Sequence, residues 1–347
     1  MKRALRLAAR AAGRTSPNPM VGAVVVKDGA VVGEGFHHRA GEAHGEIVAL
    51  EKAGDAARGA TLYVTLEPCT HQGRTPPCVD RVVAAGVARV VAAMRDPDPR
   101  VDGRGMRALK AAGIDAEVGT LEREARRLNE GFIARVEKAR PFVVLKLAVT
   151  VDGRVAVPGR RYLSGKAAQR EVHRMRDRAD AVMVGVGTVL ADDPELTVRE
   201  VKGRDPLRVV LDADARTPAA AKIVRAGDPQ RTIVFVARDA DQRRTKRLRD
   251  TGVLLATLPR SEPDGLDAGA GLRWLAEHGV NSVLSEGGPQ VASSLLRAGL
   301  VDRLALVITP LAGGDGPLAL AGLGPPLELR GLRARRLGAD LLLEAEL

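Results

Sequence analysis

Cysteine and aromatic residues are both scarce in this chain of 347 residues. Its two cysteines, Cys69 and Cys78, are too few for a disulfide framework, so metal ligation in a reducing cytoplasm is the better interpretation of them. Aromatic residues make up 2% of the chain, which leaves few rings on which single-stranded nucleic acid could stack. No apolar run is as long as a bilayer-crossing helix requires. We therefore expect neither a disulfide scaffold nor a membrane protein.

Basic residues are abundant, with a formal net charge of +11 and a pI of about 10.2. This charge favours an anionic partner, either nucleic acid or phosphorylated small molecules, although a solvated arginine-rich surface would produce it too. The sparse aromatics disfavour nucleic acid, so phosphorylated small molecules are expected. Residues 1–14 are Arg-rich and acid-free like a transit peptide, but we expect a first helix there, because candidate site residues follow at once from Asn18.

Strand-like and helical segments alternate along the chain, which predicts an α/β fold. In the first half, an apolar strand at 21–26, a hairpin turn at Lys27-Asp28-Gly29 and a partner strand at 31–35 come first. The other expected segments there are helices at 46–52, 78–85 and 105–112, strands at 61–66 and 87–93, and a charged closing helix at 121–138.

A second unit begins near Pro141, so we expect two α/β domains, 1–140 and 141–347. The expected strands are 142–149, 181–187, 207–211, 232–236 and 282–284, with helices at 166–176 and 291–298. The charge run at 238–249 is interpreted as a solvated helix.

The first half carries a metal-site motif made of His44-Gly45-Glu46, Pro68-Cys69 and Pro77-Cys78. One imidazole and two thiolates supply three ligands, and a catalytic zinc takes three protein ligands and leaves a position open for water. His44 and Glu46 can converge only if His44 lies at the irregular start of a helix, because positions i and i+2 do not share a helical face. The pattern predicts a zinc-dependent deaminase in which Glu46 moves protons.

Eight residues separate the two cysteines, where the general deaminase motif has two. Together with the segments 17–22, 33–37 and 40–46, this long loop resembles the bifunctional pyrimidine deaminase/reductase family of riboflavin biosynthesis. The resemblance implies a cytidine-deaminase-like α/β/α domain that deaminates 2,5-diamino-6-(5-phosphoribosylamino)pyrimidin-4(3H)-one hydrolytically. It places Zn²⁺ on His44, Cys69 and Cys78 and makes Glu46 the catalytic residue. Substrate contacts are implied at Asn18, His37, His71, Arg74 and Asp96.

In the second half, Lys146 interrupts an apolar strand, either as an edge-strand lysine that reaches water or as a cation held at a cofactor site. The Gly287-Gly288-Pro289 turn, which follows a strand and precedes a helix, leaves backbone N–H groups free for phosphate. There is no G-x-G-x-x-G fingerprint, so a Rossmann domain is not expected.

With the segments 150–154, 184–189 and 191–199, these features resemble the reductase half of the same family. The resemblance implies a dihydrofolate-reductase-like α/β domain that uses NADPH to reduce the ribose of 5-amino-6-(5-phosphoribosylamino)uracil. The implied cofactor contacts are Ala148, Tyr162, Thr188, Asp192, Gly288, Pro289, Gln290, Val291, Ala292, Ser293 and Ser294. The implied substrate contacts are Lys146, Arg160, Arg176, Leu196, Arg199 and Glu286. Of these, Arg176 and Arg199 are expected to clamp the substrate phosphate. The segment 155–165 is shorter than is usual in the family, with Arg160 near the place of a serine and Tyr162 at that of a tryptophan.

Two alternatives compete with the bifunctional enzyme. One is a nucleic-acid base deaminase with a degenerate reductase-like domain, and the other is a zinc-stabilised binding protein without turnover. Glu46 and the count of three ligands disfavour the second, since a structural zinc usually recruits a fourth protein ligand. For the enzyme we expect a cytoplasmic homo-oligomer.

Overall fold

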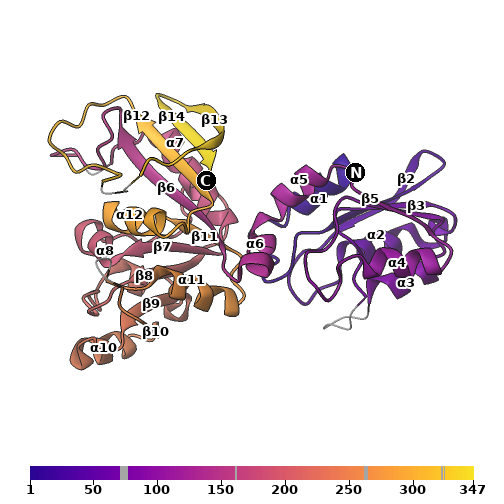
Figure 1. Cartoon of the computed structure of the whole chain (residues 1–347), viewed down its shortest axis with the longest axis horizontal. Helices are drawn as coiled ribbons and strands as arrows, with labels where there is room; N and C mark the ends of the chain where they lie inside the picture. The colour runs from indigo at the N-terminus through magenta and orange to yellow at the C-terminus, as the bar shows by residue number, and fades with distance from the viewer. Residues whose placement is uncertain (71–76, 161, 262–264, 322, 324) are drawn as a thin grey trace. The chain divides into compact units, whose positions relative to one another are not determined.

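The computed structural model describes residues 1–70, 77–160, 162–261, 265–321, 323 and 325–347. His71 and Arg74, two of the predicted substrate contacts, lie outside the described residues. The chain divides into two compact units, Met1–Ala139 and Arg140–Leu347, and each is built on a sheet of its own (Figure 1). Within the described ranges, no helix is long and apolar enough to cross a membrane.

The first unit has a five-stranded sheet in the order β2-β1-β3-β4-β5. Its strands are β1 (Gly22–Lys27), β2 (Ala30–Phe36), β3 (Thr61–Val64), β4 (Arg89–Ala92) and β5 (Asp115–Val118). The predicted hairpin is confirmed: β1 pairs antiparallel with β2, and Asp28 and Gly29 turn the chain with positive φ angles of 50° and 77°. Strands β3, β4 and β5 are parallel, and β5 was not predicted.

Helices pack against this sheet and confirm most of the expected helical segments. They are α1 (Lys2–Ala9), α2 (Gly45–Ala53), the 3₁₀ helix η1 (Gly54–Ala57), α3 (Cys78–Ala84), α4 (Arg104–Ala111), α5 (Glu122–Leu128) and α6 (Glu130–Lys138). Helix α2 lies so close to β2 that a Cβ on Gly33 would be 2.2 Å from the Ala49 carbonyl oxygen. The two glycines of Gly33-Glu34-Gly35 therefore let α2, which carries Glu46, approach the sheet.

The single closing helix predicted at 121–138 is wrong, because the chain breaks at Asn129 into α5 and α6. The Asn129 side chain accepts a hydrogen bond from the Met20 backbone N at 2.7 Å and donates one to the Met20 oxygen at 3.0 Å. Both polar groups of the Met20 backbone are thus satisfied by one amide, which fixes the start of α6 against the segment that precedes β1.

The second unit has a nine-stranded sheet in the order β10-β9-β8-β7-β11-β6-β12-β14-β13. Its strands are β6 (Phe142–Thr150), β7 (Ala181–Gly185), β8 (Leu207–Leu211), β9 (Thr232–Ala237), β10 (Leu254–Leu258), β11 (Ser282–Ser285), β12 (Arg303–Thr309), β13 (Arg330–Leu337) and β14 (Asp340–Glu346). Neighbours from β10 to β12 are parallel, and β14 pairs antiparallel with β12 and β13. Because β6 lies between β11 and β12, the edge-strand interpretation of Lys146 is wrong.

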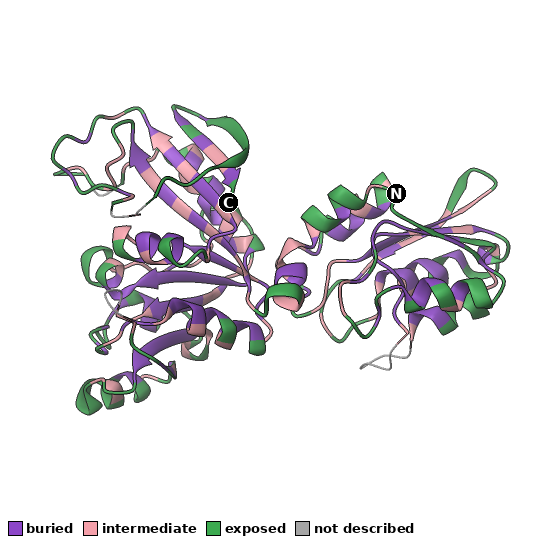
Figure 2. Cartoon of the chain, viewed as in Figure 1, coloured by how far each residue is buried: buried purple, intermediate pink, exposed green. Residues whose placement is uncertain are grey.

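Helices cover the second sheet, and Figure 2 shows its central strands buried and the outer helix faces exposed. They are α7 (Lys166–Arg178), α8 (Val186–Asp192), α9 (Lys222–Arg225), the 3₁₀ helix η2 (Pro229–Arg231), α10 (Gln242–Arg249), α11 (Ala268–Glu277) and α12 (Pro289–Arg297). Along β7, Ala181 and Met183 join one apolar cluster, whereas Val182 and Val184 join another. Both faces of the strand are therefore buried, as expected for a parallel sheet. The strand predicted at 181–187 ends at Gly185, where α8 begins.

Candidate active sites

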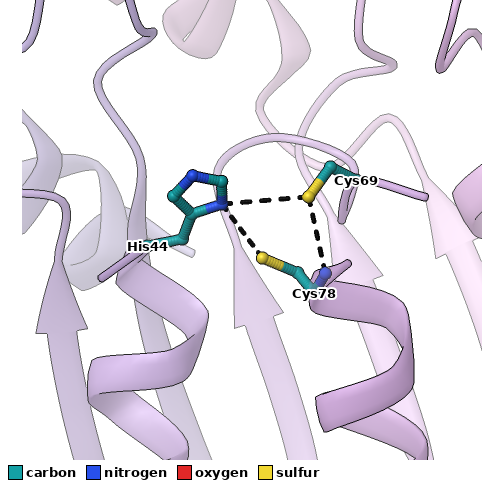
Figure 3. Close-up of side chains that lie close together, drawn as sticks. All are labelled: His44, Cys69 and Cys78. Carbon is teal, nitrogen blue, oxygen red and sulfur yellow. Dashed lines mark hydrogen bonds between the residues drawn. The ribbon is translucent and has the colours of Figure 1, made fainter. Parts of the chain in front are cut away.

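Three elements of the first unit bring His44, Cys69 and Cys78 together (Figure 3). His44 is the N-cap of α2 with an extended backbone, φ −71° and ψ 157°, so the predicted position at the irregular helix start is confirmed. Cys78 is the first residue of α3, and Cys69 lies in the segment that follows β3. The ligand atoms of the three residues all lie within 4.8 Å of one another.

The geometry of this cluster fits a zinc ion. His44 Nδ1 lies 3.0 Å from Cys78 Sγ and 3.8 Å from Cys69 Sγ. Tetrahedral zinc with ordinary Zn–N and Zn–S bonds separates such ligand atoms by about 3.6 Å, which falls between these two distances. A hydrogen bond from the Cys78 thiol lowers the pKa of Cys69 to about 4, against the opposing effect of burial, and the Cys78 backbone N also donates to Cys69 Sγ at 3.4 Å. The cluster thus favours the thiolate form of Cys69, whereas the hydrogen bond to Cys69 and burial raise the pKa of Cys78.

Glu46 lies beside the cluster with its carboxylate enclosed by protein. The residue is 3% exposed, and its Oε2 has no hydrogen-bond partner among the described residues. Burial raises the pKa of Glu46, while the neighbouring His44 opposes the shift. An enclosed carboxyl group with an unpaired oxygen next to three metal-ligating atoms is suited to exchange protons with a bound water.

A cavity of about 400 Å³ opens onto Glu46, His44 and Cys69. Of the predicted substrate contacts, Asn18, His37 and Asp96 lie on its wall. His37 Nδ1 donates to the Ala43 carbonyl oxygen at 3.1 Å, so its Nε2 accepts from the Asn18 amide, also at 3.1 Å. Burial lowers the pKa of His37, which keeps the ring neutral.

The segment that follows β4 brings polar groups to this cavity that the sequence interpretation did not assign. Besides Asp96, the wall includes Asp98 and Arg100 from this segment and Arg135 from α6. The position of Asp96 after the carboxyl end of a parallel strand is a signal for a binding site, and the same signal could have identified Asp98. Burial raises the pKa of Asp96 to about 7.

Glu67 holds this segment in place. Its carboxylate accepts hydrogen bonds from the backbone N of Asp96 at 3.3 Å, Gly103 at 2.9 Å and Met106 at 3.1 Å. The N-terminus of α4 also lies close to the cysteine segment, since a Cβ on Gly105 would be 2.1 Å from the Pro68 carbonyl oxygen. One buried glutamate, two residues before Cys69, therefore ties the Asp96 segment and α4 to the segment that carries this cysteine.

The second unit holds a larger cavity of about 970 Å³, where β7, β8 and β11 end. Many predicted contacts line it: Lys146, Ala148, Arg160, Thr188, Asp192, Glu286, Gly288, Pro289, Gln290, Val291 and Ser294. Two of its glycines leave room for a ligand near the backbone. A Cβ on Gly187 would have no atom within 4 Å, and a Cβ on Gly288 would contact only Thr188 Oγ1, at 3.5 Å. Gly288 is the N-cap of α12, so free N–H groups at a helix N-terminus face this space and fit the phosphates of a dinucleotide.

Three charged side chains meet at the wall of this cavity. Arg176 donates from Nε and Nη2 to the two carboxylate oxygens of Glu286, at 2.6 and 3.0 Å, and Lys146 Nζ lies 3.9 Å from Glu286 Oε2. Burial lowers the pKa of Lys146, and Arg176 lowers the pKa of Glu286 despite the opposing effect of burial. Arg176 is therefore held as the partner of Glu286, and the cavity wall includes Lys146 and Glu286 but not Arg176.

Five other predicted reductase contacts also lie off the described wall of this cavity: Tyr162, Leu196, Arg199, Ala292 and Ser293. Leu196 is 2% exposed, and Ala292 is fully buried in the core. The Ser293 hydroxyl donates to the Ala321 carbonyl oxygen at 2.9 Å. Tyr162 is 57% exposed, and the Arg199 guanidinium lies 3.7 Å from Glu195. Packing or local pairing thus occupies the side chains of Leu196, Arg199, Ala292 and Ser293.

Both units match families of known proteins. Residues 1–94 match the family described as the cytidine and deoxycytidylate deaminase zinc-binding region, and residues 141–343 match the RibD C-terminal domain. The chain is 41% identical over 350 residues to the riboflavin biosynthesis protein RibD of Aquifex aeolicus, covering 99% of this chain and 96% of that protein. It is 44% identical over 342 residues to RibD of Escherichia coli, covering 93% and 91% of the two proteins.

Solved structures match over the same length. RibD of Acinetobacter baumannii, form 1, has a TM-score of 0.89 and 37% identity, covering 99% of this chain and 97% of that chain. A diaminohydroxyphosphoribosylaminopyrimidine deaminase/5-amino-6-(5-phosphoribosylamino)uracil reductase of Thermotoga maritima has a TM-score of 0.87 and 37% identity, covering 100% and 97%. The cluster of His44, Cys69 and Cys78 and the glycine-lined cavity of the second unit thus occur in a chain that matches these proteins over nearly its whole length.

Proposed function

We infer, because the chain belongs to the RibD family of riboflavin biosynthesis proteins, that it is a bifunctional deaminase and reductase. It deaminates 2,5-diamino-6-(5-phosphoribosylamino)pyrimidin-4(3H)-one and reduces the ribose of 5-amino-6-(5-phosphoribosylamino)uracil. We assign the deaminase to a domain at 1–140 and the reductase to one at 141–347. Relatives that match both units argue against a nucleic-acid deaminase with a degenerate second domain and against a binding protein without turnover.

The observation that carries the deaminase assignment is the buried Glu46 oxygen beside His44, Cys69 and Cys78, which has no hydrogen-bond partner in the described ranges. A zinc ion held by these three ligands supplies a water whose pKa is near neutrality. Glu46 takes a proton from the attacking water and delivers protons to the leaving amino group, so that ammonia departs. Burial raises the pKa of Glu46, which favours its uptake of a proton from the water.

The rest of the first cavity holds the substrate. We assign Asn18, the neutral His37 ring and Asp96 to the pyrimidine and ribose, because they are polar groups fixed on the wall by hydrogen bonds and burial. A phosphate group calls for guanidinium donors. Arg74 and His71 remain predicted contacts, and Arg100 and Arg135 add two guanidinium-bearing residues to the described wall.

In the second unit, we assign the coenzyme to the glycine-lined part of the cavity and the phosphoribosyl substrate to the side near Lys146 and Glu286. NADPH supplies the hydride for the reduction. Gly288 and the first turn of α12 bind phosphate through backbone N–H groups, while Thr188 and Asp192 line the same wall. Lys146, held near Glu286, offers a donor to the sugar oxygens, and Arg176 keeps the Glu286 carboxylate in place.

The test of these assignments is a pair of histidine variants in the whole chain. His44→Ala is expected to lose zinc, measured by elemental analysis, and ammonia release, while NADPH oxidation with the deaminated substrate continues. His38→Ala is the matched control, because His38 is an exposed neighbour that does not belong to the metal-ligating cluster. Retention of zinc and ammonia release by His44→Ala would overturn the ligand assignment.

We also propose that the enzyme works in the cytoplasm as a homo-oligomer. A reducing compartment keeps Cys69 and Cys78 available as thiolate ligands. Exposed leucines on and near β13 offer an apolar surface for a second copy: Leu327, Leu329 and Leu332, the last 63% exposed. Light scattering on the purified chain gives its mass directly, and a monomer at micromolar concentration would contradict the oligomer.

A further inference from the structure

A group of charged residues lies on the wall of the second cavity where β8 ends. Asp214 and Arg216 follow β8, and Arg260 follows β10. We propose that Arg216 binds the 2′-phosphate of NADPH and thereby makes the second unit select NADPH over NADH. This proposal rests on the reductase function assigned above and adds to it the residue that determines coenzyme specificity.

The order of the strands places Arg216 at the correct end of the cavity. In the sheet, β8 is separated from β6, which carries Lys146, by β7 and β11. Neighbouring strands are about 4.8 Å apart, so β8 and β6 lie roughly 14 Å apart across the sheet. The Gly288 turn follows β11 and therefore lies between them. With the reactive ring near Lys146 and the central phosphates at Gly288, the second ribose of a dinucleotide reaches the end of β8.

The turn after β8 is rigidly built, so Arg216 has a defined position. Asp212 is fully buried, and its carboxylate accepts hydrogen bonds from the backbone N of Arg216 at 2.9 Å and of Thr217 at 2.6 Å. The Thr217 hydroxyl donates to the same carboxylate at 2.7 Å. Ala215 has a φ of +52°, a strained value that these bonds hold in place. The backbone is fixed, while the Arg216 side chain remains exposed at the cavity.

The charges around Arg216 and Arg260 explain why we assign the selection of NADPH over NADH to Arg216 rather than to Arg260. Arg260 donates to Asp214 at 2.8 Å and to Asp239 at 2.8 Å, so two carboxylates already offset its charge. In the part of the chain that the structure describes, no ion pair involves Arg216. A 2′-phosphate binds best to a guanidinium that is not already paired with carboxylates as Arg260 is, through charge-assisted hydrogen bonds. A free 2′-hydroxyl gains little from Arg216, since the hydroxyl carries no charge.

The direct test is binding of nucleotide fragments to the full chain by calorimetry, with 2′,5′-ADP and 5′-ADP as probes. The wild-type chain is expected to bind 2′,5′-ADP more tightly. Arg216→Ala should weaken 2′,5′-ADP binding by about tenfold to hundredfold, the effect of losing hydrogen bonds to a charged group, and leave 5′-ADP unchanged. Arg216→Lys should restore part of the difference. Arg225→Ala is the matched control, because Arg225 is an exposed arginine that does not line the cavity.

Steady-state kinetics with both coenzymes separate the proposal from the function on which it rests. Arg216→Ala should raise the KM for NADPH and leave kcat and the KM for NADH nearly unchanged. If the variant oxidises NADPH and still discriminates between the two probes as the wild type does, the role of Arg216 is overturned while the reductase function stands. If the wild-type chain binds neither probe and oxidises neither coenzyme, the reductase function itself fails and the role of Arg216 with it.

Discussion

The buried ion pair between Arg176 and Glu286 allows a quantitative test of how the second site is held. The two side chains are 11% and 9% exposed and are joined by two hydrogen bonds of 2.6 and 3.0 Å. Arg176→Met leaves the Glu286 carboxylate buried without its main partner, and breaking a buried pair in this way costs about 3–5 kcal/mol. Because Lys146 Nζ remains 3.9 Å away and offsets part of the charge, we expect about 3 kcal/mol, the lower end of that range.

The measurement is urea unfolding followed by the fluorescence of Trp274. This residue is the sole tryptophan of the chain and lies in α11, so it reports on the second unit even though a chain of two units need not unfold in one step. Arg174→Met is the control on the same helix. The Arg174 side chain is 50% exposed and lies 3.0 Å from Glu171, so its loss should cost less than about 1 kcal/mol.

A double variant completes the cycle. Glu286→Gln combined with Arg176→Met removes the buried charge together with its partner, so its cost should be smaller than the sum of the two single costs. NADPH oxidation should fall in both single variants, while ammonia release should stay at the wild-type level. If Arg176→Met costs no more than Arg174→Met, Arg176 does not stabilise Glu286, and its predicted role as a phosphate clamp becomes the better interpretation.

Three further predictions concern the first unit. Glu46→Gln should lower the rate of ammonia release by about 10²–10⁴-fold, the usual contribution of general acid–base catalysis, with zinc content unchanged. The control Glu42→Gln, on the same cavity wall, should have little effect on this rate. A loss of the same size in both variants would contradict the role of Glu46. The pKa of Asp96 is raised to about 7, above the ordinary value of about 3.9 in the unfolded chain. Asp96 therefore stabilises the fold below about pH 4, and this stabilisation is lost as the pH rises to about 7. In calorimetric melting, the stability of Asp96→Asn should therefore decline less over that pH range than the stability of the wild type. An unchanged decline would refute the assignment. Gly105→Ala should destabilise the first unit by about 1–3 kcal/mol and weaken zinc retention, because the added Cβ would lie 2.1 Å from the Pro68 oxygen. Chelator competition measures the retention of zinc. Retention equal to that of the wild type would contradict this prediction.

Local patterns were sufficient to predict the elements that position the metal-ligating cluster. The apolar run before Lys27-Asp28-Gly29 predicted the β1–β2 hairpin, and the H-x-E spacing predicted His44 at the start of α2. Both signals are contained in a few consecutive residues, where backbone preferences and periodicity determine the structure. The spacing of the cysteines likewise predicted a shared site, and the cluster confirms that their ligand atoms meet.

Strands β10, β12 and β14 and helix α11 were also not predicted, and β12, with the sequence RLALVIT, has a local apolar signal. Other missed features depend on contacts between distant segments. Strand β13, with the sequence RGLRARRL, is mostly exposed and has no apolar run, and it forms because its backbone pairs with β14. Strand β5 has a single buried residue, Ala116, and depends on its pairing with β4. The break at Asn129 depends on Met20, which is 109 residues away in the sequence. None of these partners can be identified from periodicity alone.

The same distinction applies to the sites. Lys146 and Glu286 were both predicted as contacts, but their proximity follows from the pairing of β6 with β11. The pairing of Arg176 with Glu286 joins residues 110 positions apart, and the sequence alone indicated a phosphate contact for Arg176 instead. The role of Glu67 as an acceptor for three backbone N–H groups was also missed, since nothing in its neighbourhood shows which segments fold onto it.

The most direct test of the bifunctional assignment is a single reaction that contains the purified chain, zinc, NADPH and 2,5-diamino-6-(5-phosphoribosylamino)pyrimidin-4(3H)-one, with ammonia and NADPH followed together. We expect ammonia to appear first and NADPH then to be consumed in an equal amount. Removal of zinc should stop both signals, and adding the deaminated substrate should restore NADPH consumption alone. NADPH oxidation from the diamino substrate without ammonia, or ammonia release that is never followed by NADPH consumption, would contradict the assignment.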